Sequence, residues 1–265
     1  KLFGISESGI EILSFADIPA ETGMGSYSTF TVGLITALAA YQGIKMTRYE
    51  IAEMACHIER DLLKEAGGKQ DQYIAAFGGI TQLIFEKNSK VVVSPVQISH
   101  DDIQKLERSI LLFYTGIKRN SPKVQRALIR GVKKETRTLE SLHEIKRLGI
   151  ETEKILCNGQ VDCYAEFLDR HWEAKKKLSD GITNGRINHL YEQAKAYGAT
   201  AGKLIGAGGG GYLLLYCSDL NQRDRLISRL EQEDLQQLRF RFDFTGATVL
   251  VDDGIRNKFS LPVSV

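Results

Sequence analysis

The sequence has little net charge and no long apolar run. Its formal net charge is +2, which is too small to indicate a nucleic-acid or membrane partner. No apolar stretch reaches the roughly 18 residues of a membrane-spanning helix, and no signal peptide is visible. We therefore expect neither nucleic acid nor a membrane as a partner.

Cysteine is also scarce. The four cysteines stand at positions 56, 157, 163 and 217 and form no pair of Cys-x-x-Cys motifs, so the sequence predicts no zinc site. Scattered cysteines in a chain of this length are more typical of a reducing cytoplasm than of a disulfide scaffold. A cytoplasmic location is therefore predicted.

The composition is that of an ordinary globular enzyme, with 43% hydrophobic and 26% charged residues. A length of 265 residues suits two modest domains or one large one. No internal repeat or low-complexity linker is visible, and the boundary between an N-terminal and a C-terminal half is predicted near residues 105–120.

Hydrophobic periodicity predicts a mixture of helices and strands. Apolar runs and alternating patterns predict strands at 10–16, 80–85, 91–96, 111–114, 212–217 and 238–244. Helical spacing predicts helices at 30–42, 47–62, 187–197 and 221–233, with a mostly helical segment over 122–179. Thr47 and Glu50 form a capping box at the start of the second helix.

The segment from Gly23 to Thr29 combines glycines with hydroxyl residues directly before a predicted helix. Glycines let the backbone approach a ligand closely, and the free N–H groups of a helix N-terminus attract anions. The segment is either a phosphate-binding loop or a tight turn with Ser or Thr as the N-cap. It is not the common nucleotide P-loop, because no Gly-x-x-x-x-Gly-Lys-Ser/Thr string occurs.

Two acidic residues stand near predicted helix ends. Glu59 lies near the end of the capped helix, and Asp71 follows the break at Gly67-Gly68. One carboxylate could bind Mg²⁺, which prefers oxygen ligands, and another could orient or deprotonate a substrate hydroxyl. Most acidic residues are solvated surface groups, so the residue types alone do not decide between these interpretations.

A run rich in glycine occupies positions 206–211, before a predicted strand. The run satisfies Gly-x-Gly-x-x-Gly, but a dinucleotide-binding loop must follow a strand and open a helix, so a Rossmann site is excluded. Four consecutive glycines indicate a close approach of the backbone to a ligand or to a neighbouring loop. A flexible linker is the alternative, which the apolar strand that follows disfavours.

In this order, the three segments resemble the GHMP kinase superfamily, whose members include galactokinases, homoserine kinases and mevalonate kinases. Residues 18–26, Ile-Pro-Ala-Glu-Thr-Gly-Met-Gly-Ser, look like its phosphate-loop motif, and residues 203–212 look like its C-terminal glycine-rich motif. Residues 68–79 resemble the catalytic segment of its heptose 7-phosphate kinases, and so do residues 30–34, 57–59, 114–116 and 171–179. The likeness covers nearly the whole chain.

The resemblance implies an α+β fold with a ribosomal protein S5 domain 2-like N-terminal domain and a ferredoxin-like C-terminal domain. The expected boundaries are 1–110 for a partial ATP-binding domain and 111–265 for the C-terminal domain. The family's N-terminal strand, with its Arg-x-Pro-Leu-Arg segment and Gly-Gly-Gly-Thr-Asp turn, is absent from the sequence. The N-terminal domain is therefore expected to be incomplete in this chain.

The implied reaction is transfer of the ATP γ-phosphoryl group to the anomeric hydroxyl of D-glycero-D-manno-heptose 7-phosphate. The 1,7-bisphosphate would feed nucleotide-activated heptose and surface polysaccharide. Two alternatives stay open: a fucokinase- or galactokinase-like acceptor, and a GHMP domain that binds without catalysis. ATP, Mg²⁺ and a small-molecule sugar phosphate are the implied ligands, and a homodimer is a further expectation.

The motif positions also imply roles for single residues. Asp71 corresponds to the catalytic base, and Glu59 corresponds to the Mg²⁺ ligand, with Ser28 beside it. Tyr27 replaces the second serine of the family's loop, which implies either that Ser28 or Thr29 substitutes for it or that nucleotide binding is weakened. The expected ATP ligands are Gly23, Gly25, Ser26, Ser28, Thr29, Gly208, Gly209 and Gly210, and the expected sugar-phosphate ligands are Lys69, Gln70, Arg119, Lys175 and Lys176.

Overall fold

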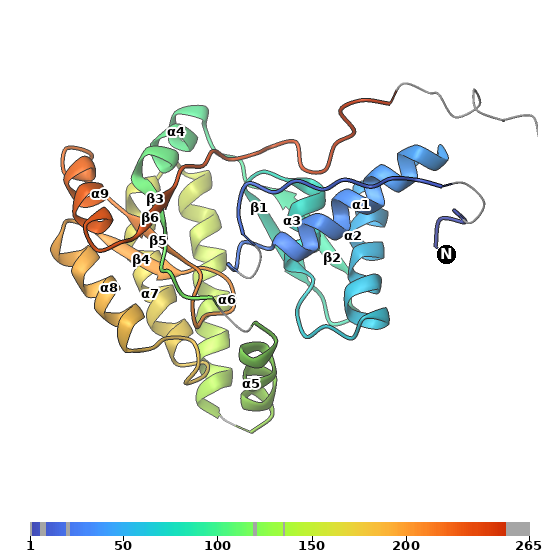
Figure 1. Cartoon of the computed structure of the whole chain (residues 1–265). Coiled ribbons are helices and arrows are strands. Elements are labelled where there is room, and N and C mark those ends of the chain that lie inside the picture. The colour runs from blue at the N-terminus through green and yellow to red at the C-terminus, as the bar shows by residue number, and fades with distance from the viewer. Residues whose placement is uncertain (1, 6–8, 20–21, 119–120, 135, 253–265) are drawn as a thin grey trace, which may run out of the picture. The chain divides into compact units, whose positions relative to one another are not determined.

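The computed structural model describes residues 2–5, 9–19, 22–118, 121–134 and 136–252, without the side chains of 121–123 and 133–134. Helices and strands are mixed along the chain, as the predicted α+β class requires (Figure 1). The chain divides into two compact units. Unit 1 comprises Lys1–Asp17, Tyr27–Gly79 and Asp243–Val265, and unit 2 comprises Ile18–Ser26 and Ile80–Phe242. The domain boundary at residue 110 stays a prediction.

Unit 1 is built mainly from helices. They are α1 (Ser26–Gln42), α2 (Arg48–Cys56), the π-helical turn η1 (His57–Leu62) and α3 (Gln70–Phe77). Helix α1 ends at Gly43, whose φ of 68° is in the left-handed region, as predicted. The capping box of α2 is confirmed, because Glu50 N–H donates to Thr47 Oγ1 (3.2 Å) and Thr47 N–H donates to Glu50 Oε2 (2.7 Å).

A returning segment holds the C-terminal end of α3. Gly79 N–H donates to the carbonyl oxygen of Asp243 (2.6 Å), and the Arg48 guanidinium donates to the carbonyl oxygen of Thr245 (3.0 Å). A Cβ on Gly246 would lie 2.6 Å from a carbonyl oxygen of α3. Only glycine permits this approach, so the segment after residue 242 is fitted to the end of this helix.

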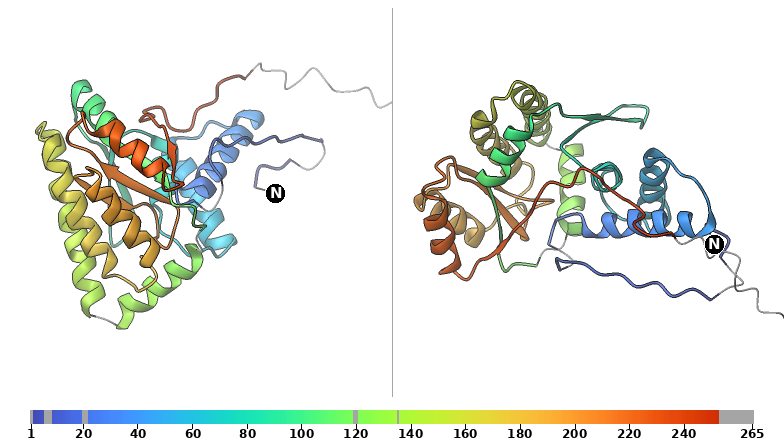
Figure 2. Two further views of the ribbon diagram at one scale, coloured as in Figure 1. Left: turned by 60° about the vertical axis from the view of Figure 1, so that its left-hand side comes forward. Right: turned by 90° about the horizontal axis from the view of Figure 1, so that it is seen from above.

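Unit 2 centres on a four-stranded antiparallel sheet of order β4-β5-β3-β6. Its strands are β3 (Ile110–Tyr114), β4 (Ala201–Leu204), β5 (Tyr212–Tyr216) and β6 (Gln236–Leu238), and a separate hairpin is formed by β1 (Thr81–Phe85) and β2 (Val91–Pro95). Helices surround the sheet (Figure 2): α4 (His100–Ser109), α5 (Ser121–Lys134), α6 (Thr136–Cys157), the 3₁₀ turn η2 (Val161–Cys163), α7 (Tyr164–Lys176), α8 (Gly185–Ala196) and α9 (Arg223–Glu231).

Strand β3 is buried on both faces. Its Leu111 and Phe113 belong to one core cluster with residues of α8 and α9, whereas Ile110 and Leu112 belong to a second cluster with residues of α4 and the C-terminal part of α6. Side chains alternate between the faces of a strand, so a continuous apolar run is what a strand covered on both sides needs.

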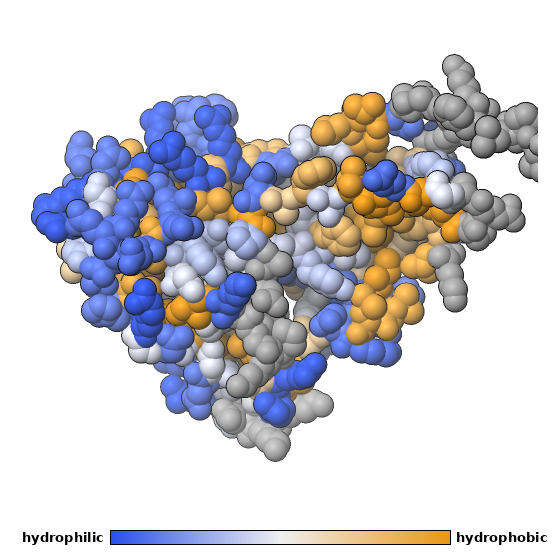
Figure 3. All heavy atoms as spheres, viewed as in Figure 1, coloured by the Kyte–Doolittle hydropathy of each residue, from blue (hydrophilic) through white to orange (hydrophobic). Residues whose placement is uncertain are grey.

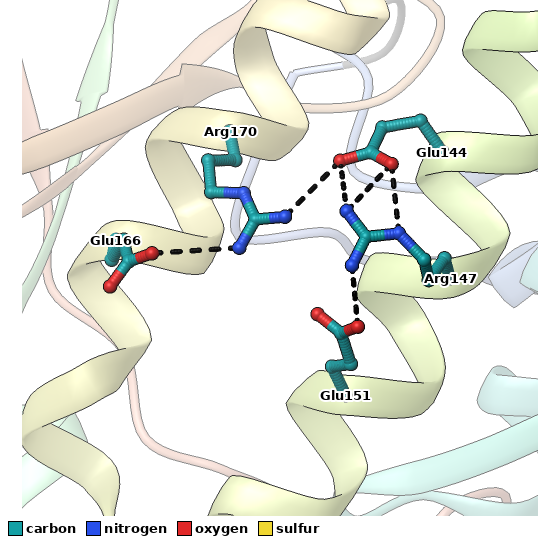
Figure 4. A network of polar contacts seen from close by, with 5 residues as sticks. All are labelled: Glu144, Arg147, Glu151, Glu166 and Arg170. Atoms are coloured by element: carbon teal, nitrogen blue, oxygen red, sulfur yellow. Dashed lines mark hydrogen bonds and ion pairs between the residues drawn. The ribbon is translucent and has the colours of Figure 1, made fainter.

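Helices α6 and α7 also share a network of ion pairs (Figure 4). Glu144 accepts from Arg147 (2.7 Å) on its own helix and from Arg170 of α7 (3.3 Å). Arg147 also pairs with Glu151 (2.5 Å), and Arg170 pairs with Glu166 (3.5 Å). These side chains are a third or more exposed, so water screens the network and it orients the helices more than it stabilises them.

Two strand predictions are wrong. Residues 10–16 form no strand, and Leu13 and Phe15 are 72% and 92% exposed; exposed apolar side chains of unit 1 are visible in Figure 3. An apolar pattern makes a strand only beside a partner, and none of the described strands pairs with this segment. In place of the strand predicted at 238–244, the structure has β6 at 236–238; its partner β3 begins at Ile110, opposite residue 240, so residues 241–244 have no neighbour in that strand.

Candidate functional site

Glu59 is a carboxylate buried in unit 1 with one oxygen unpaired. It is 4% exposed, and its Oε2 accepts hydrogen bonds from Ser28 Oγ (2.9 Å) and from Gln72 Nε2 (2.6 Å). Its Oε1 is buried and has no hydrogen-bond partner among the described residues. Buried polar atoms are normally paired, and a buried charge above all, so this oxygen is suited to receive a cation.

Three helices bring this cluster together. Ser28 lies in the first turn of α1 and Gln72 in the first turn of α3, whereas Glu59 lies in the π-helical turn η1 that continues α2. A π-helical turn inserts an extra residue into the helical repeat and is frequent at functional sites. Sequence reasoning identified Glu59 and Ser28 but not the hydrogen bond from Gln72.

The donor set fits Mg²⁺ bound together with phosphate. Within the described residues, no group of three or more His, Cys, Asp or Glu side chains could hold a metal by itself. Mg²⁺ commonly takes one or two carboxylates and completes its octahedron with water and phosphate oxygens. The unpaired oxygen of Glu59 and the hydroxyl of Ser28 could supply the protein's part of such a shell.

Asp71 is exposed in the first turn of α3, directly before Gln72. The helix dipole favours a carboxylate at this end. Because Gln72 bonds to Glu59, α3 brings the predicted base and the predicted metal ligand into one neighbourhood of unit 1. The roles assigned to Asp71 and Glu59 stay predictions.

The two residues before Asp71, Gln70 and Lys69, differ in their contacts. Gln70 is exposed at the start of α3, and Lys69 donates to both carboxylate oxygens of Glu53 (2.8 and 2.9 Å), which also accepts from the Tyr73 hydroxyl. Burial alone would raise the pKa of Glu53, but these hydrogen bonds outweigh it and hold the pKa below its ordinary value. Lys69 therefore has an anionic partner within the protein, and its predicted contact with substrate stays a prediction.

The first glycine-rich loop belongs to unit 2 and runs into α1. Gly23 and Gly25 have φ values of 90° and 72°, in the left-handed region that favours glycine. Thr22 is buried, and its hydroxyl donates to the carbonyl oxygen of Pro19 (3.0 Å). The hydroxyl oxygen of Ser26, at the start of α1, is buried and unpaired within the described part of the chain. A backbone of this form with a free hydroxyl could hold phosphate oxygens.

Tyr27, which replaces the second serine of the family's loop, is 51% exposed. Burial and the carboxylates of Glu59 and Glu65 raise the pKa of its phenol, so the group stays neutral. Ser28 is buried against Glu59, whereas Thr29 is exposed. Of the two expected replacements for the missing serine, Ser28 has the position that a metal ligand beside Glu59 requires.

The second glycine-rich loop is tightly packed within unit 2. Gly211 N–H donates to the carbonyl oxygen of Ile117 (2.9 Å), and Gly209 N–H donates to that of Ile182 (2.9 Å). A Cβ on Gly211 would lie 2.0 Å from the carbonyl oxygen of Thr22 in the first loop. The glycines therefore permit a close approach to neighbouring loops, and the flexible-linker alternative is wrong. The predicted contacts of Gly208, Gly209 and Gly210 with nucleotide stay predictions.

The predicted sugar-phosphate lysines of α7 already have partners. Lys175 is buried, and its ammonium donates to the carbonyl oxygens of Leu204 (2.8 Å) and Gly206, where the second glycine loop begins. Lys176 pairs with Glu173 (2.6 Å) and lies over the Trp172 ring. Arg119 is outside the described residues.

Sequence reasoning missed two titratable groups beside Lys175. Burial, helped by the charges of Lys203 and Lys175, lowers the pKa of His171 to about 3, and its Nδ1 has no partner among the described residues. Burial lowers the pKa of Lys203 on β4 to about 8. The spacing of His171 and Lys175 by four residues on α7 was the available signal, because such residues share a helix face.

An α+β chain with two glycine-rich loops and a buried carboxylate between helices has the features of the GHMP kinase class. The model for the GHMP kinases N terminal domain matches residues 1–79, and the model for GHMP kinases C terminal matches residues 153–236. The chain belongs to the GHMP kinase family. Among the described helices, none has the length and apolar character of a membrane span.

Heptose kinases are among its relatives. The chain is 33% identical over 233 residues to the D-glycero-alpha-D-manno-heptose 7-phosphate kinase of Campylobacter jejuni, over 88% of this chain and 68% of that protein. It is 28% identical over 242 residues to the L-fucokinase/L-fucose-1-P guanylyltransferase of Bacteroides fragilis, over 89% of this chain and 25% of that protein.

A solved structure shows the same fold. The crystal structure of a D-glycero-D-manno-heptose 1-phosphate kinase from Bacteroides thetaiotaomicron matches with a TM-score of 0.69 and 29% identity, over 88% of this chain and 64% of that chain. The chain therefore spans 64% to 68% of the length of these two heptose kinases.

Proposed function

We propose that the protein transfers the γ-phosphoryl group of ATP to the anomeric hydroxyl of D-glycero-D-manno-heptose 7-phosphate and releases the 1,7-bisphosphate. The observation that carries this proposal is Glu59, a buried carboxylate with one oxygen bonded by Ser28 and Gln72 and the other unpaired. The 33% identity to a heptose 7-phosphate kinase supports the choice of substrate.

Phosphoryl transfer requires positioned reactants and neutralised charge more than covalent help from the protein. We assign the phosphates of ATP to the backbone of Gly23 and Gly25, the hydroxyl of Ser26 and the glycines 208–210. Glu59 and Ser28 would hold Mg²⁺, which when bound neutralises charge on the phosphate oxygens. Thr29 is exposed and stays a secondary candidate.

Asp71 is the proposed base. Its carboxylate would accept the proton of the anomeric hydroxyl and hold the hydroxyl oxygen towards the phosphorus. Asp71 is exposed at the surface of unit 1, and Gln72 links its helix to Glu59. One short helix would then support both the base and the metal ligand.

The 7-phosphate would be bound by cations, and we retain Lys69, Gln70, Arg119 and Lys176 as candidates. Lys175 is assigned a supporting role instead, because its ammonium already donates to two carbonyl groups. We also retain, as proposals, a cytoplasmic location, a homodimer, and domain boundaries at 1–110 and 111–265. The product would feed nucleotide-activated heptose for surface polysaccharide.

A fucose or galactose 1-kinase is the second candidate, which the 28% identity to an L-fucokinase favours. A domain that binds ligand without turnover is the third, and Tyr27 in the phosphate loop favours it. The test is ATP consumption by the purified protein with Mg²⁺ and heptose 7-phosphate, hexose 6-phosphates, fucose or galactose. Turnover on the heptose phosphate alone supports the proposal. Preference for fucose or galactose selects the second candidate, and no turnover with any sugar selects the third.

A further inference from the structure

A polar groove of about 630 Å³ lies in unit 2, outside every residue assigned to the kinase site. It is lined by three arginines, Arg108, Arg223 and Arg241, together with Phe240 and the acidic residues Glu107 and Asp224. We call it the arginine groove. Its volume is within the range of small-molecule sites in proteins.

Strand register places this groove at one end of the central sheet. Ile110, which follows Arg108 by two residues, pairs with Tyr216 at the end of β5, and β6 reaches this end just before Phe240. The second glycine loop lies at the other end, where Thr115 N–H donates to the carbonyl oxygen of Gly211. The four residue steps of β3 separate the two ends by roughly 14 Å. The groove is therefore separate from the glycine loop of the proposed kinase site.

The arginines that line the groove are not fully neutralised by hydrogen bonds or ion pairs with neighbouring residues. Arg108 and Arg241 form no hydrogen bond or ion pair through their guanidinium groups within the described part of the chain. Arg223 donates from Nε to the carbonyl oxygen of Arg108 (2.9 Å), which fixes its guanidinium at the wall, and its contact with Asp224 is long, at 3.8 Å. Glu107 is already engaged, because its Oε1 accepts from Phe242 N–H (2.8 Å).

We propose that the arginine groove binds a small molecule that carries a phosphate or pyrophosphate group. Guanidinium groups form paired, charge-assisted hydrogen bonds with phosphate oxygens, and an anion between three of them relieves their mutual repulsion. The inference does not depend on the proposed kinase reaction.

The surroundings favour a small anion over an extended polyanion. Two carboxylates flank the three arginines, and the whole chain has a net charge of only +2, so a nucleic acid would meet little further positive charge. Phe240 packs edge-to-face on Phe242, with ring centroids 5.6 Å apart, and also lines the groove. The phosphate could therefore come from a nucleotide, whose base would stack on Phe240, or from a simpler phosphorylated compound.

The test is a calorimetric titration of the protein with inorganic pyrophosphate and with ADP, both without Mg²⁺. Arg108→Gln and Arg241→Gln should each weaken pyrophosphate binding about tenfold, because each removes one charge-assisted contact. Arg225→Gln is the matched control: it makes the same change of charge on α9, at a residue that does not line the groove. Both target arginines are exposed, so melting temperatures should not change.

Backbone amide shifts locate the bound ion. Pyrophosphate should shift amides at 108–110, 220–224 and 240–242, and the control variant should bind within twofold of the unaltered protein. If ADP binds there more tightly than pyrophosphate, and Phe240→Leu removes the difference, the ligand is a nucleotide. Equal affinities identify a simpler phosphate compound. The proposal is overturned by the absence of saturable binding, by equal losses in all three arginine variants, or by shifts confined to residues 206–211.

Discussion

Replacing Glu59 by Gln separates a metal-binding role from a structural one. Gln has the same shape, so its carbonyl oxygen can still accept from Ser28 and Gln72, and its amide nitrogen takes the place of the unpaired oxygen. Making the two bonds neutral weakens them by about 1 kcal/mol each. A neutral amide costs less to bury than a carboxylate, which offsets part of this loss.

These effects partly cancel, so we expect the free energy of unfolding of Glu59→Gln to stay within about 2 kcal/mol of the unaltered protein. Activity should change far more. Loss of the anionic metal ligand is expected to lower turnover at least about a hundredfold, which corresponds to about 2.7 kcal/mol of barrier. Turnover should also require a higher Mg²⁺ concentration for half-saturation.

The assays are urea denaturation and ATP consumption over a range of Mg²⁺ concentrations. Glu65→Gln serves as the matched control, because it makes the same change of charge at an exposed residue six positions away. The control should keep turnover within about twofold. Glu59 is not the metal ligand if Glu59→Gln retains turnover and Mg²⁺ dependence, and its carboxylate is structural if the variant is strongly destabilised.

Four further substitutions are informative. Asp71→Asn should reduce turnover about a hundredfold while ATP affinity stays within about twofold, and unchanged turnover would remove Asp71 from the chemistry. Gly211→Ala places a Cβ 2.0 Å from a carbonyl oxygen at a φ of 95° and should lose at least about 2 kcal/mol of stability, whereas Gly33→Ala, in open space on α1, should gain up to about 1 kcal/mol. The folded-state pKa of His171 lies at about 3, below the unfolded value of 6.5, so stability should fall as pH drops from 6.5 towards 3, by up to about 1.4 kcal/mol per unit. Urea denaturation at pH 7 and pH 5 should show this slope in the unaltered protein but not in His171→Gln, and an imidazole that titrates near pH 6.5 would contradict it.

Local signals predicted much of the helical structure. The capping box at Thr47 and Glu50 is confirmed at atomic detail, as is the helix end at Gly43. Strand β3 was predicted over 111–114 because these residues are all apolar or aromatic, and in the structure it begins one residue earlier, at Ile110. Helix α4 was missed although its Ser99 cap is local, since its first turn is rich in charge and its apolar face is narrow.

The wrong predictions concern segments whose secondary structure depends on a neighbouring strand. Residues 10–16 have the composition of a strand, but strand formation depends on a neighbouring strand, which composition cannot supply. In the candidate site, the sequence indicated Glu59, Asp71 and both glycine loops. It could not predict that one oxygen of Glu59 is unpaired or that Lys175 is held by carbonyl groups, because both depend on contacts between distant segments.

The most direct test of the central proposal is the position of the new phosphate on the sugar. The purified protein is incubated with Mg²⁺, ATP and D-glycero-D-manno-heptose 7-phosphate, and the product is followed by phosphorus NMR. We predict a second sugar phosphate resonance coupled to the anomeric proton, formed in step with ADP and lost in Glu59→Gln and Asp71→Asn. A phosphate at another carbon, or no sugar phosphate formed by a folded protein, would contradict the account.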